Sequence, residues 1–189
     1  MAQMRLPRFV AAGIAALALA TGLAACGKGE SGTESSPARE GLAVEVAGVD
    51  YNVFITRELN LRIPPDKAYY EGPPAKPGMV LYGVFLQACG IGKRADATDN
   101  FVVEDNQGNR FLPRTLPKTN SFAYNPRPLT KNHCIPQSGS VAQLGPSAGA
   151  MLLFEFPLTN TENRPLQLII NPPGAAALTP ESKRIDLDL

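Results

Sequence analysis

Three cysteines and a single histidine are the side chains of this chain best suited to nucleophilic, redox or metal chemistry. His133 directly precedes Cys134, a pattern that suggests a metal ligand pair or a thiol–imidazole pair. A zinc site needs three or four ligands, and adjacent residues of an extended segment point their side chains apart. We therefore expect a loop histidine, no metal and no cofactor. Cys89 and Cys134 form an even pair, which outside the cytoplasm predicts a disulfide, with two separate buried thiols as the alternative.

A second candidate is the segment Gly145-Pro146-Ser147-Ala148-Gly149, which has the G-x-S-x-G spacing of a serine nucleophile elbow. Such an elbow joins a strand to a helix, and its catalytic histidine follows later in the chain. Here a strand-like apolar run follows Gly149, and His133 precedes Ser147. The segment therefore predicts a turn, and we expect no enzymatic activity.

An oxygen-rich cluster surrounds residue 105. It consists of Asp96, Asp99, Glu104, Asp105, Asn106 and Asn109. Calcium prefers such ligands, but Gly108 is out of register with the D-x-[DN]-x-[DN]-G loop. Asp, Asn and Gly also favour tight turns, so the cluster predicts a hairpin turn rather than a metal site.

The third cysteine, Cys26, ends the sequence Leu23-Ala24-Ala25-Cys26, after an apolar run over residues 9–20 that two arginines precede. This order resembles the signal peptide and lipobox of bacterial lipoproteins. The resemblance implies a cysteine that carries acyl chains and a protein anchored on the extracytoplasmic face of the cell membrane. The alternatives are an uncleaved membrane helix, although the run is shorter than the roughly 20 residues that a span needs, and a cleaved signal with a free thiol.

The chain then divides into a leader over residues 1–25, the lipidated Cys26 with a flexible Gly/Ser-rich linker over 26–41, and one domain over 42–189. Eighteen prolines and seventeen glycines indicate many turns and few long helices. The formal net charge is +1, which gives no support for nucleic-acid binding.

Two features of the domain suggest contact surfaces. No acidic residue occurs between Asp105 and Glu155, whereas this stretch holds five basic residues: Arg110, Arg114, Lys118, Arg127 and Lys131. It could contact anionic lipid, an anionic envelope polymer or an envelope protein, or its charges could be neutralised by acidic neighbours in the fold. Tyr69 and Tyr70 lie in a proline-rich loop, where they could form a contact surface or pack the loop onto its own domain.

Apolar periodicity predicts strands throughout the domain. The expected strands cover residues 49–55, 79–89, 101–103, 110–112, 150–156 and 166–170, with an edge strand at 185–189. The run at 79–89 is apolar on both faces, as in a central strand between two layers. Two long loops, 59–78 and 113–140, separate these strands. The sequence therefore predicts an all-β, two-sheet sandwich.

The succession of segments 79–88, 101–111, 145–157, 166–170 and 184–189 resembles the telokin-like, immunoglobulin-fold domain of unknown function found in bacterial lipoproteins. The resemblance covers about residues 42–189 and implies an immunoglobulin-like β-sandwich. We expect a non-enzymatic binding or interaction module at the cell envelope. A carrier of an apolar or anionic small molecule is the alternative, and a hydrolase is a third.

Overall fold

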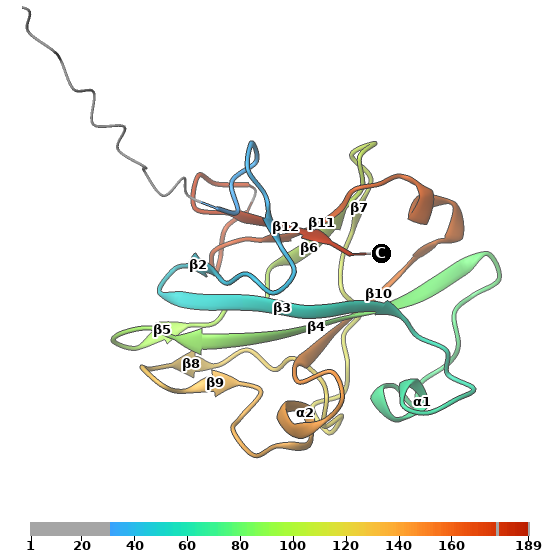
Figure 1. Ribbon diagram of the computed structural model, residues 1–189, viewed down its shortest axis with the longest axis horizontal. Coiled ribbons are helices and arrows are strands. Elements are labelled where there is room, and N and C mark those ends of the chain that lie inside the picture. Colours follow the sequence, from blue (N-terminus) through green and yellow to red (C-terminus); the bar gives the residue numbers. More distant parts are fainter. Residues whose placement is uncertain (1–30, 177, 189) are drawn as a thin grey trace, which may run out of the picture.

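Two long antiparallel strands form the centre of the sheet with the longer strands, here called the larger sheet, in the computed structural model, which describes residues 31–176 and 178–188 (Figure 1). They are β3 (Val49–Glu58) and β4 (Met79–Gly90). The order of this sheet is β10-β4-β3-β2, with β2 (Val44–Val46) and β10 (Ala150–Pro157) on either side. The short strand β9 (Cys134–Ile135) also pairs with the end of β4.

The second sheet packs against the first and has the order β1-β12-β11-β6-β7. Its central strands are β12 (Lys183–Leu187), β11 (Leu166–Ile170) and β6 (Phe101–Glu104). The predicted hairpin is confirmed, since Val103 of β6 pairs with Phe111 of β7 (Arg110–Phe111). The all-β sandwich predicted from the sequence is confirmed.

Apolar side chains from both sheets fill the space between them. Val53, Leu86 and Phe154 come from the first sheet, and Leu168 and Ile185 from the second, all fully buried. Each such side chain contributes about 1.5–3 kcal/mol when it leaves water. This interior is the main source of the fold's stability.

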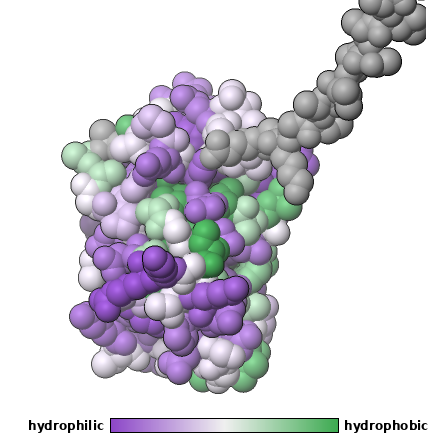
Figure 2. All heavy atoms as spheres, turned by 90° about the vertical axis from the view of Figure 1, so that its left-hand side faces the viewer, coloured by the Kyte–Doolittle hydropathy of each residue, from purple (hydrophilic) through white to green (hydrophobic). Residues whose placement is uncertain are grey.

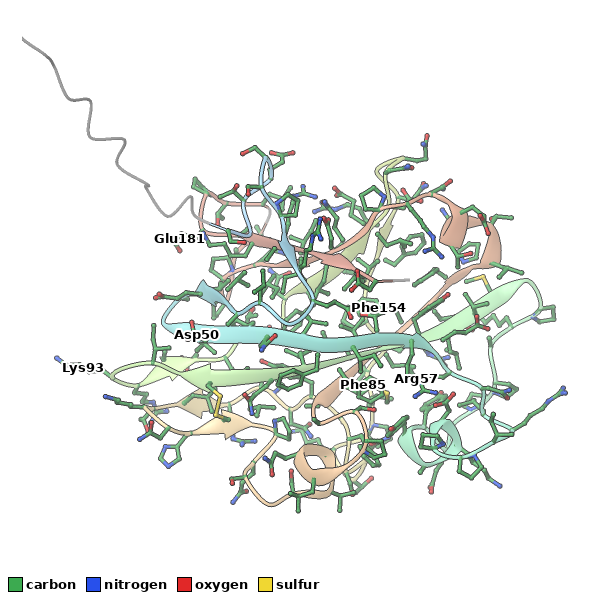
Figure 3. All side chains as sticks on the ribbon, viewed as in Figure 1. Asp50, Arg57, Phe85, Lys93, Phe154 and Glu181 are labelled. Carbon is green, nitrogen blue, oxygen red and sulfur yellow. A yellow bond between two sulfur atoms is a disulfide. The ribbon has the colours of Figure 1, made fainter. Side chains whose placement is uncertain are left out.

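Loops form a third layer over the outer face of the β10–β4–β3 sheet. Leu86 of β4 faces the inner core, whereas Phe85 lies in a separate apolar cluster with Tyr69 and Met151. Figure 3 shows Phe154 between the sheets and Phe85 on the loop side of the larger sheet. Both faces of β4 are covered, which explains its continuous apolar run and confirms that it is a central strand.

Short helices and strands interrupt the two long loops. The first loop carries α1 (Asp66–Tyr69). The second carries β8 (Pro128–Leu129) and β9, and is followed by α2 (Val141–Leu144). β8 pairs with β5 (Ala95–Asp96), and a 3-10 helix, η1 (Leu158–Glu162), follows β10. These elements anchor the predicted loops at several points.

The flexible linker predicted over residues 26–41 is wrong in its described part. Ala38 and Arg39 form β1, which pairs in parallel with Ile185 and Asp186 of β12. Ala38 is fully buried, and the Arg184 N–H donates to the Gly32 carbonyl at 2.7 Å. Ordered structure therefore extends upstream of residue 42. The same pairing makes β12 an interior strand rather than the expected edge strand.

No helix within residues 31–176 and 178–188 is long and apolar enough to cross a membrane. The predicted leader and Cys26 lie outside the described residues.

Candidate functional site

The two long loops face each other across an open groove of about 440 Å³ on the loop side of the larger sheet. Tyr70, Glu71 and Gly72 line one wall, and Thr115, Thr119 and Phe122 line the other. Both polar and apolar residues line it. A volume of this size is within the range of ligand-binding clefts. We call this feature the loop groove.

Asn120 joins the two walls of the loop groove. Its side-chain N–H donates to the Tyr69 carbonyl at 2.9 Å, and its side-chain oxygen accepts from the Phe122 N–H at 2.8 Å. The Phe122 ring meets the Tyr69 ring edge to face, with centroids 4.9 Å apart. The walls are therefore fixed relative to each other before any partner binds.

Tyr70 forms the base of one wall. The Arg114 guanidinium lies 5.7 Å from the centre of its ring, in cation–π range, and also pairs with Glu155 at 3.5 Å. Gly72 passes directly over the Tyr70 hydroxyl. A Cβ at residue 72 would lie 2.2 Å from that oxygen, so any other residue would require the Tyr70 ring to move.

An ion pair between a half-buried arginine and a buried aspartate attaches the first loop to the sheet. Asp66 of α1 is 2 % exposed and lies 2.8 Å from the Arg57 guanidinium of β3. Its second oxygen accepts from the Asn60 N–H at 2.8 Å. Figure 3 shows Arg57 at the end of β3 beside this loop. Breaking such a pair leaves an uncompensated buried charge, so the contact holds α1 in place.

Tyr69 and Tyr70 are 1 % and 8 % exposed, so the structure shows the second of the two alternatives, in which they pack the loop onto its own domain. The exposed contact surface considered for them does not form. The Tyr69 hydroxyl accepts a 2.6 Å hydrogen bond from Ser147, the serine of the G-x-S-x-G segment. Ser147 is buried, and β10 follows it directly, so this segment is the turn that the sequence predicts.

The second glycine of the G-x-S-x-G segment, Gly149, is required by close packing. A Cβ at residue 149 would lie 2.7 Å from the backbone nitrogen of Leu86. The glycine therefore allows the turn to approach β4 closely, a structural reason unrelated to catalysis.

Residues 104–109 of the oxygen-rich cluster form a hairpin turn built around Asp105, whereas Asp96 lies in β5 and Asp99 lies between β5 and β6. Burial opposes the charge of Asp105, but hydrogen bonds from the side chains of Asn109, Asn160 and Asn163 hold the pKa of the carboxyl well below its usual value. Its other oxygen accepts from the Gln107 and Asn109 backbone N–H groups. Among the described residues, no group of three or more His, Cys, Asp or Glu side chains could hold a metal ion.

Cys89 and Cys134 form the predicted disulfide, with an S–S distance of 2.08 Å. It joins β9 to the end of β4. Beside it lies a second hollow of about 550 Å³, which we call the polar hollow. Gln87, Arg127 and His133 are among the residues that line it.

The five basic residues of the middle segment do not form one patch. Arg110 pairs with Glu104 at 3.0 Å, and Arg114 with Glu155, so acidic residues outside the segment neutralise both. Lys118 is exposed on the second loop near the loop groove. Arg127 and Lys131 lie at the opposite end, near the disulfide.

Sequence reasoning missed Asn120, Gly72 and the polar hollow. Asn120 acts across 51 residues of chain, which no local pattern encodes. Gln87 carried a usable signal, because it is the one polar side chain in the otherwise apolar run of β4. It marks the point at which the outer face of the sheet changes from apolar to polar.

Neither a protein-family model nor a curated protein sequence matches this chain. Two solved structures resemble it. One is the yjhA protein from Bacillus subtilis, with a TM-score of 0.45 and 10 % identity over 80 % of this chain and 99 % of that protein. The other is a putative lipoprotein (ycdA) from Bacillus subtilis subsp. subtilis str. 168, with a TM-score of 0.47 and 9 % identity. That match covers 77 % of this chain and 38 % of the lipoprotein chain.

Proposed function

We propose that this chain is a lipid-anchored, extracytoplasmic protein of the telokin-like lipoprotein family, and that its domain is a non-enzymatic binding module. The lipobox-like sequence ending at Cys26 supports the anchor. The loop groove supports the binding role and is its contact site. The partner is an envelope protein or an envelope polymer.

The observation that carries this proposal is the rigid assembly of the loop groove. Asn120 hydrogen-bonds both walls, and Phe122 packs on Tyr69, so a partner meets a surface that is already ordered. Preorganised walls reduce the conformational entropy lost on binding. The exposed side chains of Glu71, Thr119 and Ser121 then supply hydrogen-bonding groups around an aromatic base.

The position of Ser147 supports a non-enzymatic role over a hydrolase. A serine nucleophile needs a general base within hydrogen-bond reach and an approach for substrate. The Ser147 hydroxyl is buried and donates to the Tyr69 phenol, and the His133 side chain is engaged with Thr130. The residues of the motif thus serve the packing of the first loop.

A small-molecule carrier remains the second candidate, and the observation that favours it is the size of the two hollows. A carrier for apolar ligands would hold them between the sheets, where Leu86, Phe154 and Leu168 instead pack together. The ligand site of a carrier would therefore be a surface hollow such as the loop groove or the polar hollow.

The test is site-specific photo-crosslinking of the full-length chain in its native membrane. A photoreactive residue replaces Thr119 in the loop groove, or Gln107 in the exposed β6–β7 turn as the control. We expect a discrete crosslinked species from position 119 alone. Equal crosslinking from both positions, or none from either, would show that the groove is not a contact site.

The anchor is tested separately with Cys26→Ala. We expect this variant to leave the membrane fraction and appear folded in the soluble fraction, because its acyl chains are absent. Continued recovery of the variant with the membrane would contradict lipid anchoring while leaving the groove result unaffected.

A further inference from the structure

The polar hollow lies at the other end of the larger sheet from the loop groove. In Figure 1, α1 beside the groove is at the right of the sheet, whereas β8 and β9 beside the hollow are at the left. Gln87 forms its floor from the outer face of β4, where the apolar cluster around Phe85 has ended. The wall comes from the segment that the disulfide attaches to β4.

Among the described residues that line the polar hollow, Arg127 and His133 carry basic nitrogen groups, and none carries a carboxylate. Arg127 donates one guanidinium N–H to the Cys134 carbonyl at 2.6 Å, which fixes the group beside the hollow. Its remaining donors are available for the oxygens of an anion such as phosphate. His133 uses Nδ1 in a hydrogen bond with Thr130, so Nε2 is the nitrogen left for a ligand.

Side-chain amides complete the lining. Besides Gln87, these come from Asn132, Gln137 and Gln143. The Gln143 side-chain oxygen already accepts from the Gly139 N–H at 3.0 Å, which leaves its two N–H donors for a ligand. Neutral amides suit hydroxyl groups, because they can both donate and accept.

Further basic residues lie at the same end of the larger sheet. The Lys131 N–H donates to the Gly92 carbonyl at 2.9 Å, which places Lys131 beside the β4–β5 connection that carries Lys93 and Arg94. Figure 3 shows Lys93 at the tip of that connection, and Figure 2 shows that hydrophilic residues cover most of this end of the molecule. Two acidic residues occur in the strand pairing near the hollow, Asp96 opposite Pro128 and Asp50 opposite Cys89. Among the described residues, neither forms an ion pair with Arg127.

We propose that the polar hollow binds a phosphate group joined to a small hydroxylated body, of the size of glycerol phosphate. Arg127 and His133 contact the phosphate, and the amides of Gln87 and Gln143 contact the hydroxyl groups. The hollow of about 550 Å³ has room for more than a phosphate, and the side-chain amides that line it beyond Arg127 and His133 are the reason that a hydroxylated body is part of the proposal. The phosphate comes either from an anionic lipid headgroup or from a soluble or polymeric phosphate ester.

The disulfide gives the hollow a fixed shape. Cys134 lies directly between His133, which lines the hollow, and Ile135, which is fully buried in the core. The covalent bond to Cys89 therefore holds the Arg127 acceptor carbonyl and the His133 backbone in register with β4. A site held this way requires little rearrangement on binding.

The test compares Arg127→Gln with Arg62→Gln in the full-length protein. Both arginines are exposed and make no ion pair within the described residues, but Arg62 lies in the loop at the opposite end. Titration with inorganic phosphate and with glycerol 3-phosphate measures binding calorimetrically. We expect glycerol 3-phosphate to bind more tightly than phosphate, and Arg127→Gln to weaken both by about tenfold or more, since one charge-assisted pair is lost. We expect Arg62→Gln to change neither.

Sedimentation with phosphatidylglycerol or phosphatidylcholine vesicles distinguishes the two sources of phosphate. Weaker phosphatidylglycerol binding in Arg127→Gln than in Arg62→Gln supports a lipid headgroup, since the segment that carries Cys26 is the same in both variants. Loss of glycerol 3-phosphate binding with unchanged vesicle binding supports a phosphate ester. Equal effects of the two substitutions, or no binding of either phosphate compound at millimolar concentration, would overturn the proposal. None of these outcomes depends on the loop groove or on Cys26.

Discussion

Removal of the Cys89–Cys134 disulfide is the perturbation whose effect on stability follows most directly from the structure. The bond closes a loop of 45 residues. In the chain-entropy treatment, a loop of this length restricts the unfolded state by about 4 kcal/mol at 25 °C. Cys89 and Cys134 are both only partly buried, so replacing them with alanine adds little packing loss. We therefore expect the double variant to lose about 3–4 kcal/mol of unfolding free energy.

Urea unfolding followed by far-UV circular dichroism measures this loss, since the chain contains no tryptophan for fluorescence. Both proteins carry Cys26→Ala, which prevents disulfide exchange. With a urea dependence of about 2 kcal/mol per molar, the midpoint should fall by roughly 2 M. The dependence itself should increase, because the unfolded chain without the crosslink exposes more surface. A loss below about 1 kcal/mol would refute the view that this bond restricts the unfolded state.

Three further predictions concern single side chains. Asp105→Asn should lower the unfolding free energy by about 2–4 kcal/mol at pH 7, because it places an amide donor among other donors. The lowered folded-state pKa of Asp105 stabilises the native state of the wild type above about pH 4, and this stabilisation is lost as the carboxyl is protonated. The variant should therefore lose less stability than the wild type as the pH falls from 5 to 2. Tyr69→Phe should cost about 1–2 kcal/mol by leaving the buried Ser147 hydroxyl unpaired, with Tyr70→Phe as the control, and thermal unfolding measures both. Gly72→Ala should displace the Tyr70 ring and reduce crosslinking from position 119, whereas Gly92→Ala, where a Cβ meets nothing within 4 Å, should leave it unchanged.

The sequence predicts those parts of the fold that periodicity encodes. The alternation in β3 and the two-sided apolar run of β4 identify both strands and the layers around them. The strand β1 cannot be predicted from the sequence, because its two residues, one buried and one exposed, are too few to show an apolar alternation. The predicted edge at β12 is wrong for the same reason, since nothing local shows that Ala38 pairs with Ile185.

The candidate sites are less predictable because they depend on contacts between distant segments. The disulfide is predictable because only two cysteines remain after Cys26 and the expected compartment is oxidising. The bond from Asn120 to the Tyr69 carbonyl is not predictable, since any polar residue of the loop satisfies the same local pattern. The tyrosine pair illustrates the ambiguity, because adjacent aromatic residues in a loop suit both a contact surface and a packed cluster.

The outer face of β4 explains why one sheet can carry two separate sites. Its first half presents Leu81 and Phe85, on which Tyr69 packs to hold the loop groove. Its second half presents Gln87 and Cys89, and there the disulfide adds to the β9 pairing and to the burial of Ile135 in holding the covering segment. A polar floor cannot retain a loop by the hydrophobic effect, so a polar binding site on this face requires another attachment. Loss of the disulfide should therefore weaken glycerol 3-phosphate binding while crosslinking from position 119 persists, and a parallel loss of both would show that the two halves are a single unit.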